Sequence, residues 1–219
     1  MITFETLFPA MIYMNLDKRT DRRVLAEKEF ENLEISPVRM PGVFIKGAPN
    51  QAINDALGCM FAHIECLKYG LESDSNVFIF EDDIKFVGEN VKQNIDMACT
   101  ELNELDWDMF YLCANILKPC YQVTDHLAKL THAQNTAGYG VNKKFIKKLL
   151  DYLPLDFKIG QIWIDVIYAD TVVPNNNCYV SIPMMGVQRE GWSDIMNANM
   201  RYEDYMLERY WTNLVKKEI

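Results

Sequence analysis

The chain has 219 residues, of which 49% are apolar and 12% aromatic, enough for the packed core of one sizeable domain. This composition excludes a disordered chain. Its 31 acidic residues outnumber the 22 lysines and arginines and give a net charge of −9. Such a charge argues against a protein that binds nucleic acid, because those proteins present a basic face. An anionic substrate would need a bound cation or a small arginine cluster beside it.

The N-terminus and the cysteines bear on the compartment. The opening Met1-Ile2-Thr3-Phe4-Glu5 lacks the basic and apolar segments of a signal peptide. No apolar run reaches the ~18 residues that a membrane span needs, so we expect no transmembrane segment. The six cysteines follow neither a disulfide framework nor a CxxC zinc spacing. We therefore expect reduced thiols and a cytoplasmic protein.

The first third of the chain alternates strand and helix. An apolar strand at residues 10–14 leads into a charged helix that ends near residue 32, and a short strand at 37–40 follows. Proline and glycine between residues 41 and 50 predict a loop. Residues 54–71 carry apolar side chains at three- and four-residue spacing, which predicts an amphipathic helix packed on a sheet.

The most informative segment comes next and reads Asn76-Val77-Phe78-Ile79-Phe80-Glu81-Asp82-Asp83. Its four apolar residues predict a buried strand that runs directly into three carboxylates. Crowded acids repel one another and usually persist because a divalent metal lies between them. In open α/β sheets, ligands bind beyond the carboxyl ends of strands. The alternative is a solvated acidic turn that caps the next helix.

After the acids, the order of elements becomes mixed. We expect helices at residues 90–105 and 143–152, the second ended by Pro154, and a strand at 107–112. A hairpin at 119–130, a helix at 159–169, a strand at 178–182 and a surface helix in the tail at 200–219 complete the chain. The glycine-rich fingerprints of dinucleotide and NTP sites are absent. One α/β domain with a Rossmann-like mixed sheet flanked by helices is predicted.

Four segments, taken together and in order, carry a resemblance to a known family. They are IYMNLDKRTDRR at residues 12–23, LGCMFAHI at 57–64, FEDD at 80–83, and a closing segment with Pro183, Gln188 and Ser193-Asp194-Ile195. These segments resemble glycosyltransferase family 25, which includes lipooligosaccharide and procollagen galactosyltransferases. The chain departs from the family at Thr20, where proline is common, and at Ala62, where serine usually precedes the histidine.

The resemblance implies a GT-A type fold, a UDP-sugar donor, Mn²⁺ or Mg²⁺, and inversion at the anomeric carbon. It implies that residues 1–112 form the nucleotide-sugar half, 113–199 the acceptor-side half and 200–219 a helical tail. A hydroxyl of a glycan or of a hydroxylated, collagen-like peptide would be the acceptor. The donor sugar, the acceptor and the oligomeric state, a homodimer included, stay open.

We expect the three acids to have different roles in sugar transfer. A metal held by carboxylates neutralises a departing diphosphate as a Lewis acid. We expect Asp83 to be a direct metal ligand and Glu81 the second or a water-mediated one. Asp82 would lie near the ribose or the donor sugar.

The donor site would draw on the first strand and on the helix that precedes the acids. Arg19 and Arg23 match the family segment and lie four residues apart, so we prefer them to Arg22 for pairing with the diphosphate. The nucleotide would bind against the backbone of Asn15-Leu16. His63 would serve the donor site or a structural hydrogen bond, and not catalysis.

The remaining candidates follow residue 130. Asp165 stands alone in an apolar stretch, where desolvation raises a carboxyl pKa and suits a general base, and Asp156 is the second choice. Gly138 would allow the backbone to approach a sugar, with Tyr139 or Trp163 offering a ring face. Three residues of the closing segment would complete the donor pocket: Gln188, Ser193 and Asp194.

Two other functions stay open. One is a catalytically silent domain that binds nucleotide sugars or carbohydrates and keeps the same fold. The other is a metal-dependent phosphotransferase or nuclease, which would also use clustered acids. The net charge of −9 disfavours a nucleic-acid substrate for the second.

Overall fold

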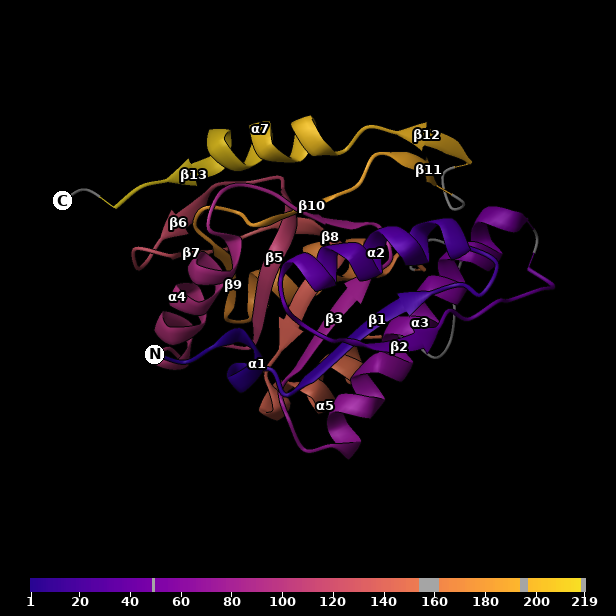
Figure 1. Cartoon of the computed structure of the whole chain (residues 1–219), viewed down its shortest axis with the longest axis horizontal. Helices are drawn as coiled ribbons and strands as arrows, with labels where there is room; N and C mark the ends of the chain where they lie inside the picture. Colours follow the sequence, from indigo (N-terminus) through magenta and orange to yellow (C-terminus); the bar gives the residue numbers. More distant parts are fainter. Residues whose placement is uncertain (49, 154–161, 194–196, 218–219) are drawn as a thin grey trace.

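A nine-stranded mixed sheet runs through the molecule in a computed structural model that describes residues 1–48, 50–153, 162–193 and 197–217 (Figure 1). The strand order is β13-β6-β7-β9-β5-β8-β3-β1-β2. The predicted single α/β domain with a mixed sheet flanked by helices is confirmed. No helix in the described part of the chain is long and apolar enough to cross a membrane.

The alternating elements predicted for the first part of the chain are present. After a short helix α1 (Phe4–Leu7), the order is β1 (Ala10–Asn15), α2 (Thr20–Asn32), β2 (Val38–Pro41), α3 (Gln51–Glu72) and β3 (Val77–Glu81). Strand β1 pairs in parallel with both β2 and β3. The carboxyl ends of these strands, and therefore Asn15 and Glu81, lie at one edge of the sheet.

The middle of the chain adds two strands to the predicted elements, the short β4 and the longer β8. It contains β4 (Ile84–Phe86), α4 (Val91–Asn103), β5 (Met109–Ile116), the predicted hairpin β6 (Cys120–Gln122) and β7 (Leu127–Lys129), β8 (Ala133–Val141) and α5 (Lys143–Tyr152). Strand β8 lies antiparallel between β3 and β5, so its first residues reach the edge where β3 ends. Residues 135–141, which include Gly138, are thus a central strand, although their glycines and asparagine resemble a loop.

The last part of the chain is more irregular. Helix α6 (Ile164–Ile167) continues as a π-helical turn (Tyr168–Val172) and a 3-10 turn (Val173–Asn175), followed by β9 (Cys178–Ser181), β10 (Gly186–Gln188), β11 (Gly191–Ser193), β12 (Ala198–Met200), α7 (Glu203–Asn213) and β13 (Leu214–Val215). Part of the helix predicted at 159–169 lies outside the described residues. The tail is more than a surface helix, because Met206 and Tyr210 of α7 are buried and β13 pairs with β6.

Side-chain alternation along β3 decides which helix each residue meets. Phe78 and Phe80 point to the face covered by α1 and α2, where their rings contact Phe4 and Phe30. Val77 points to the opposite face, toward Gly70 of α3, where α3 and α5 lie against each other. Glu81 shares that second face, and Asp82 belongs to the first.

Candidate functional site

The three acids lie at the carboxyl end of β3 and are largely shielded from solvent. Glu81 is the last residue of β3, and Asp82 and Asp83, only 8% and 5% exposed, form the turn into β4. Strand β4 pairs with β10, and helix α4 begins only at Val91. A solvated turn that caps the next helix is therefore excluded.

Arg22 of α2 joins two of the acids. Its Nη1 donates to Asp82 Oδ1 at 2.9 Å and to Asp83 Oδ2 at 3.0 Å, and its Nη2 donates to the Trp192 carbonyl at 2.7 Å. Asn15 Nδ2 donates to the other oxygen of Asp82 at 2.7 Å. Burial raises the pKa of Asp82 in spite of these donors. Asp82 is thus held rigidly at the junction of β1, β3 and α2.

Asp83 has one satisfied and one orphaned oxygen. Its Oδ2 accepts from Arg22 and from Gln188 Nε2 at 3.1 Å, and Asn135 in turn orients Gln188 through a 2.7 Å bond. Its Oδ1 is buried and has no hydrogen-bond partner among the described residues. Burial, followed by the charge of Glu81, raises the pKa of Asp83 to about 7.

An orphaned, buried carboxylate oxygen beside a second carboxylate fits a divalent metal ion. Buried polar atoms normally have a partner, and a bound ion is one explanation for an exception. Carboxylate oxygens are also the ligands that Mn²⁺ and Mg²⁺ prefer. Asp83 and Glu81, the predicted ligands, therefore form a chemically suitable pair for such an ion.

Glu81 has a different environment from its two neighbours. Thr136 Oγ1 donates to Glu81 Oε1 at 2.5 Å, and His63 Nε2 lies 3.3 Å from the same oxygen. Burial would raise the pKa of Glu81, but the contacts with His63 and Thr136 outweigh it and hold that pKa below its ordinary value. His63 is fully buried, and its Nδ1 lies 2.9 Å from the Tyr139 hydroxyl. Glu81 is therefore the one of the three acids whose pKa is lowered rather than raised.

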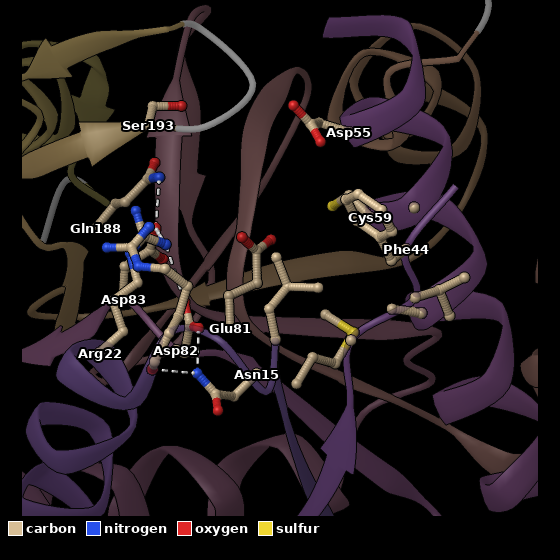
Figure 2. A pocket seen from close by; sticks show the side chains of 17 residues that line it. Asn15, Arg22, Phe44, Asp55, Cys59, Glu81, Asp82, Asp83, Gln188 and Ser193 are labelled. Carbon is tan, nitrogen blue, oxygen red and sulfur yellow. Dashed lines mark hydrogen bonds and ion pairs between the residues drawn. The ribbon is translucent and has the colours of Figure 1, made fainter. Parts of the chain in front are cut away.

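Two cavities meet at Glu81. The first, of about 790 Å³ including space open to solvent, is lined by the acids and by residues from β1, α2 and α3. Figure 2 shows the Glu81 carboxylate standing in it between Asp83, Arg22 and Gln188 on one wall and Cys59, Phe44 and Asp55 on the other. The second, of about 620 Å³, shares four residues with the first: Cys59, Glu81, Gln188 and Ser193. The two cavities thus form one continuous site.

Asp165 lines the second cavity, together with Trp163, Thr136 and Tyr202. It lies in the first turn of α6 and is half-buried, with Oδ1 accepting from the Val166 amide at 2.9 Å. Burial, followed by the charge of Glu81, raises the pKa of Asp165. A carboxyl group with a raised pKa, separate from the acid cluster but in the same cleft, can accept a proton from a bound hydroxyl.

Most of the predicted donor-site residues come together. The first cavity is lined by eight of them: Asn15, Leu16, Arg19, Glu81, Asp82, Asp83, Gln188 and Ser193. His63 lies behind its wall, where its hydrogen bonds give it a structural place. Asp194 and Asp156 lie outside the described residues.

The structure separates Arg23 and Gly138 from this cleft. Arg23 donates to Glu27 at 2.8 Å and lines a different cavity. Helix α2 begins at Thr20, so Arg19 is not helical. The four-residue spacing therefore does not place both arginines on one helical face. Gly138 is buried in the central strand β8, where an added Cβ would meet Ile84 at 3.2 Å. Tyr139, also fully buried, presents no ring face to either cavity.

Three further residues belong to the site beyond those predicted from the sequence. Arg22 lines the first cavity in place of Arg23, and its position depends on where α2 begins. Thr136 carries no sequence signal, because the pattern of residues 135–141 does not resemble a strand. Cys59 lies four residues before His63 on α3, a spacing that puts two side chains on one helical face and could have been noticed.

No family model matches the chain, and no curated protein matches it either. Membership of glycosyltransferase family 25 therefore stays an expectation. A glycosyltransferase involved in the glycosylation of the major capsid of PBCV-1 is 9% identical, with a TM-score of 0.48 over 86% of this chain and 95% of that one. An apo UDP-glucose pyrophosphorylase is 8% identical, with a TM-score of 0.45 over 93% and 80%.

A third solved structure, a UTP-bound UGPase from Acinetobacter baumannii, is 10% identical, with a TM-score of 0.40 over 95% of this chain and 72% of that one. These similarities are too slight to assign a function to this chain.

Proposed function

We propose that this protein is a metal-dependent, inverting glycosyltransferase that moves a hexose from a UDP-sugar to a hydroxyl group of a glycan or peptide. The observation that carries the proposal is the orphaned, buried oxygen of Asp83 beside Glu81, where two cavities meet. A transferase for two substrates needs a donor space and an acceptor space that join at the reacting atoms. The resemblance of four sequence segments to family 25 supports the same conclusion.

The first cavity would hold the donor. A divalent cation on Asp83 and Glu81 would neutralise the diphosphate as it departs. Arg22 keeps Asp82 and Asp83 in place and presents its guanidinium to the same cavity, where it adds positive charge for the phosphates. Asp82 can still accept a hydrogen bond from a ribose or sugar hydroxyl, because each carboxylate oxygen has two lone pairs.

The second cavity would hold the acceptor. Asp165 takes the proton of the acceptor hydroxyl while the oxygen forms its bond to the anomeric carbon. The bond from that carbon to the diphosphate breaks, and its electron pair leaves with the diphosphate. Attack from the face opposite the leaving group inverts the anomeric centre. Trp163 lines the same cavity and offers an aromatic surface to the acceptor.

One observation favours the alternative, a silent binding domain. Arg22 already compensates part of the charge of Asp82 and Asp83, so the cluster is stable to some degree without a metal. Such a domain would bind a nucleotide sugar without releasing the nucleotide.

Release of the nucleotide separates the two functions. The purified chain is incubated with UDP-glucose, UDP-galactose and GDP-sugars, with Mn²⁺ or with a chelator, and free nucleotide is measured. We expect Mn²⁺-dependent release of UDP from at least one donor. Binding of a donor without release, at every metal concentration and with candidate acceptors present, would favour the silent domain.

A further inference from the structure

A cluster of three side chains between the two cavities has a composition that the acid site does not explain. The ligand atoms of Cys59, His63 and Glu81 all lie within 4.8 Å of one another. Cys59 and His63 are four residues apart on α3 and project from one face of that helix, toward the end of β3. Figure 2 shows the Cys59 side chain and the Glu81 carboxylate facing the same space.

We propose that Cys59 Sγ, His63 Nε2 and Glu81 bind a thiophilic divalent cation such as Zn²⁺. A thiol, an imidazole and a carboxylate form a donor set suited to zinc, whereas Mn²⁺ and Mg²⁺ prefer oxygen atoms alone. Three protein ligands also leave a fourth position for water or for a ligand, which is the pattern of accessible zinc sites.

The distances suit this ion after a small adjustment. In a tetrahedral zinc site, neighbouring ligand atoms lie about 3.3–3.8 Å apart, given metal–ligand bonds of about 2.0–2.3 Å. His63 Nε2 and Glu81 Oε1 are 3.3 Å apart already. The remaining separations, at most 4.8 Å, need a shift of about 1 Å, within the range of a side-chain rotation of Cys59.

The surroundings of the cluster orient its ligands. Tyr139 lies 2.9 Å from His63 Nδ1, and its hydroxyl can accept the Nδ1 proton and so leave the Nε2 lone pair for a metal. Thr136 donates to Glu81 Oε1 and fixes the carboxylate. Cys59 lines both cavities, so an ion from solvent can reach the thiol. Burial raises the pKa of this thiol, and a bound metal would displace its proton.

Zinc at this position would have a consequence for transfer. Glu81 belongs both to this cluster and to the proposed Mn²⁺ site, so Zn²⁺ and Mn²⁺ would compete for its carboxylate, and their charges would repel each other across it. We therefore expect Zn²⁺ to inhibit Mn²⁺-supported release of UDP, an effect that rests on the proposed function. Binding of Zn²⁺ itself does not depend on it.

The direct experiment measures binding of the metal alone to the purified full chain. Zn²⁺ is titrated calorimetrically, and Co²⁺ is added in parallel as a spectroscopic probe, because a cobalt–thiolate bond gives a charge-transfer band in the near ultraviolet. The variants are Cys59→Ser, which removes the thiol, and Asp83→Asn, which alters only the acid site. Cys99→Ser, at a buried thiol on α4, is the matched control. Thermal unfolding checks the fold of each variant.

We expect one Zn²⁺ per chain and a cobalt–thiolate band in the wild type, Asp83→Asn and Cys99→Ser. Cys59→Ser should lose the band and bind Zn²⁺ at least ten times more weakly, and His63→Gln should weaken binding similarly. Equal affinity in the wild type and Cys59→Ser would overturn the proposal, and so would the absence of any thiolate band. If UDP-sugars give no activity, these binding results still decide the question.

Discussion

Glu81 and Asp83 are two residues apart, yet the structure gives them opposite electrostatic environments. Glu81 points to the α3 side and meets Thr136 and His63, which lower the pKa of its carboxyl group. Asp83 lies in the following turn, where burial and the charge of Glu81 raise its pKa to about 7. Glu81 is therefore more acidic than an ordinary glutamate, whereas Asp83 ionises only near neutral pH, and a bound cation would favour its ionised form. A run of acids in a sequence is thus not a set of equivalent ligands.

The largest expected effect tests the ligand role of Asp83. Replacing Asp83 with Asn removes the carboxylate whose orphaned oxygen fits the metal, so Mn²⁺-dependent release of UDP should fall at least 100-fold, about 3 kcal/mol in transition-state free energy. Release is measured at saturating Mn²⁺. Asp125→Asn, at an exposed acid in the turn between β6 and β7, should keep full activity. Wild-type rates in Asp83→Asn would remove the acid from the metal site.

The second test asks whether proton removal is separate from the acid pair. Asp165→Asn should lower kcat about 100-fold or more while the KM for the donor changes little, because a general base contributes typically 10²–10⁴. The pKa of Asp165 is raised, so wild-type kcat should fall as the pH drops through a value above the ordinary 3.8 of an aspartate. An unchanged kcat in Asp165→Asn would shift the role to another acid, Asp156 first.

The third test removes the ion pairs that Arg22 of α2 forms with Asp82 and Asp83. Arg22→Ala leaves Asp82 and Asp83 buried without their shared counter-charge, and should destabilise the fold by about 2–4 kcal/mol at pH 8. The carboxyl group of Asp83, whose pKa is about 7, becomes neutral as the pH falls toward 5, so the loss should shrink over that range. Urea unfolding at the two pH values measures it.

Arg23→Ala is the matched control for that test, since Arg23 is an exposed neighbour on α2 whose partner is Glu27. Its change in stability should be small and nearly the same at both pH values, because an exposed ion pair contributes little to stability. Equal losses in the two variants would show that Arg22 does not neutralise the acids.

The smallest expected effect is a gain in stability, opposite in sign to the loss expected for Arg22→Ala. Asp83 has a folded pKa of about 7 against an ordinary value of 3.8, so ionising it opposes folding. This destabilisation is absent below the ordinary value and complete above pH 7. Without metal, Asp83→Asn should therefore increase the free energy of unfolding at pH 8 by roughly 1–2 kcal/mol, which raises the thermal midpoint by a few degrees. Near pH 4 the midpoint should be unchanged. A lower midpoint at pH 8 would contradict the charge assignment.

Much of the fold could be predicted from the sequence because its patterns are local. Periodicity identified the elements from β1 to β3 and the helices α4 and α5. Strand β8 is not predicted, because its glycines resemble those of a turn. Gly140 instead serves packing, since an added Cβ would lie 2.3 Å from the ring of Phe8. Strands β4 and β10, of three residues each, are too short for a periodic signal and form by pairing with each other.

Most residues of the site could be predicted from the sequence, but the contacts between its distant residues could not. The three acids are recognisable in the sequence because they follow an apolar strand directly. The bond between Asp83 and Gln188 joins residues 105 apart, and the chemistry of that pairing has no trace in local spacing. The choice between Arg22 and Arg23 required the first residue of α2, and element boundaries are the least reliable part of a sequence-based prediction.

Binding of Mn²⁺ in the presence of UDP tests the central claim most directly, because it isolates the ion from transfer and from the acceptor. Free Mn²⁺ is counted by electron paramagnetic resonance as the wild type and Asp83→Asn are titrated, each with UDP at saturation. We predict one bound Mn²⁺ per chain in the wild type and at least tenfold weaker binding in the variant. The same affinity in both proteins would contradict the assignment of Asp83 as a metal ligand.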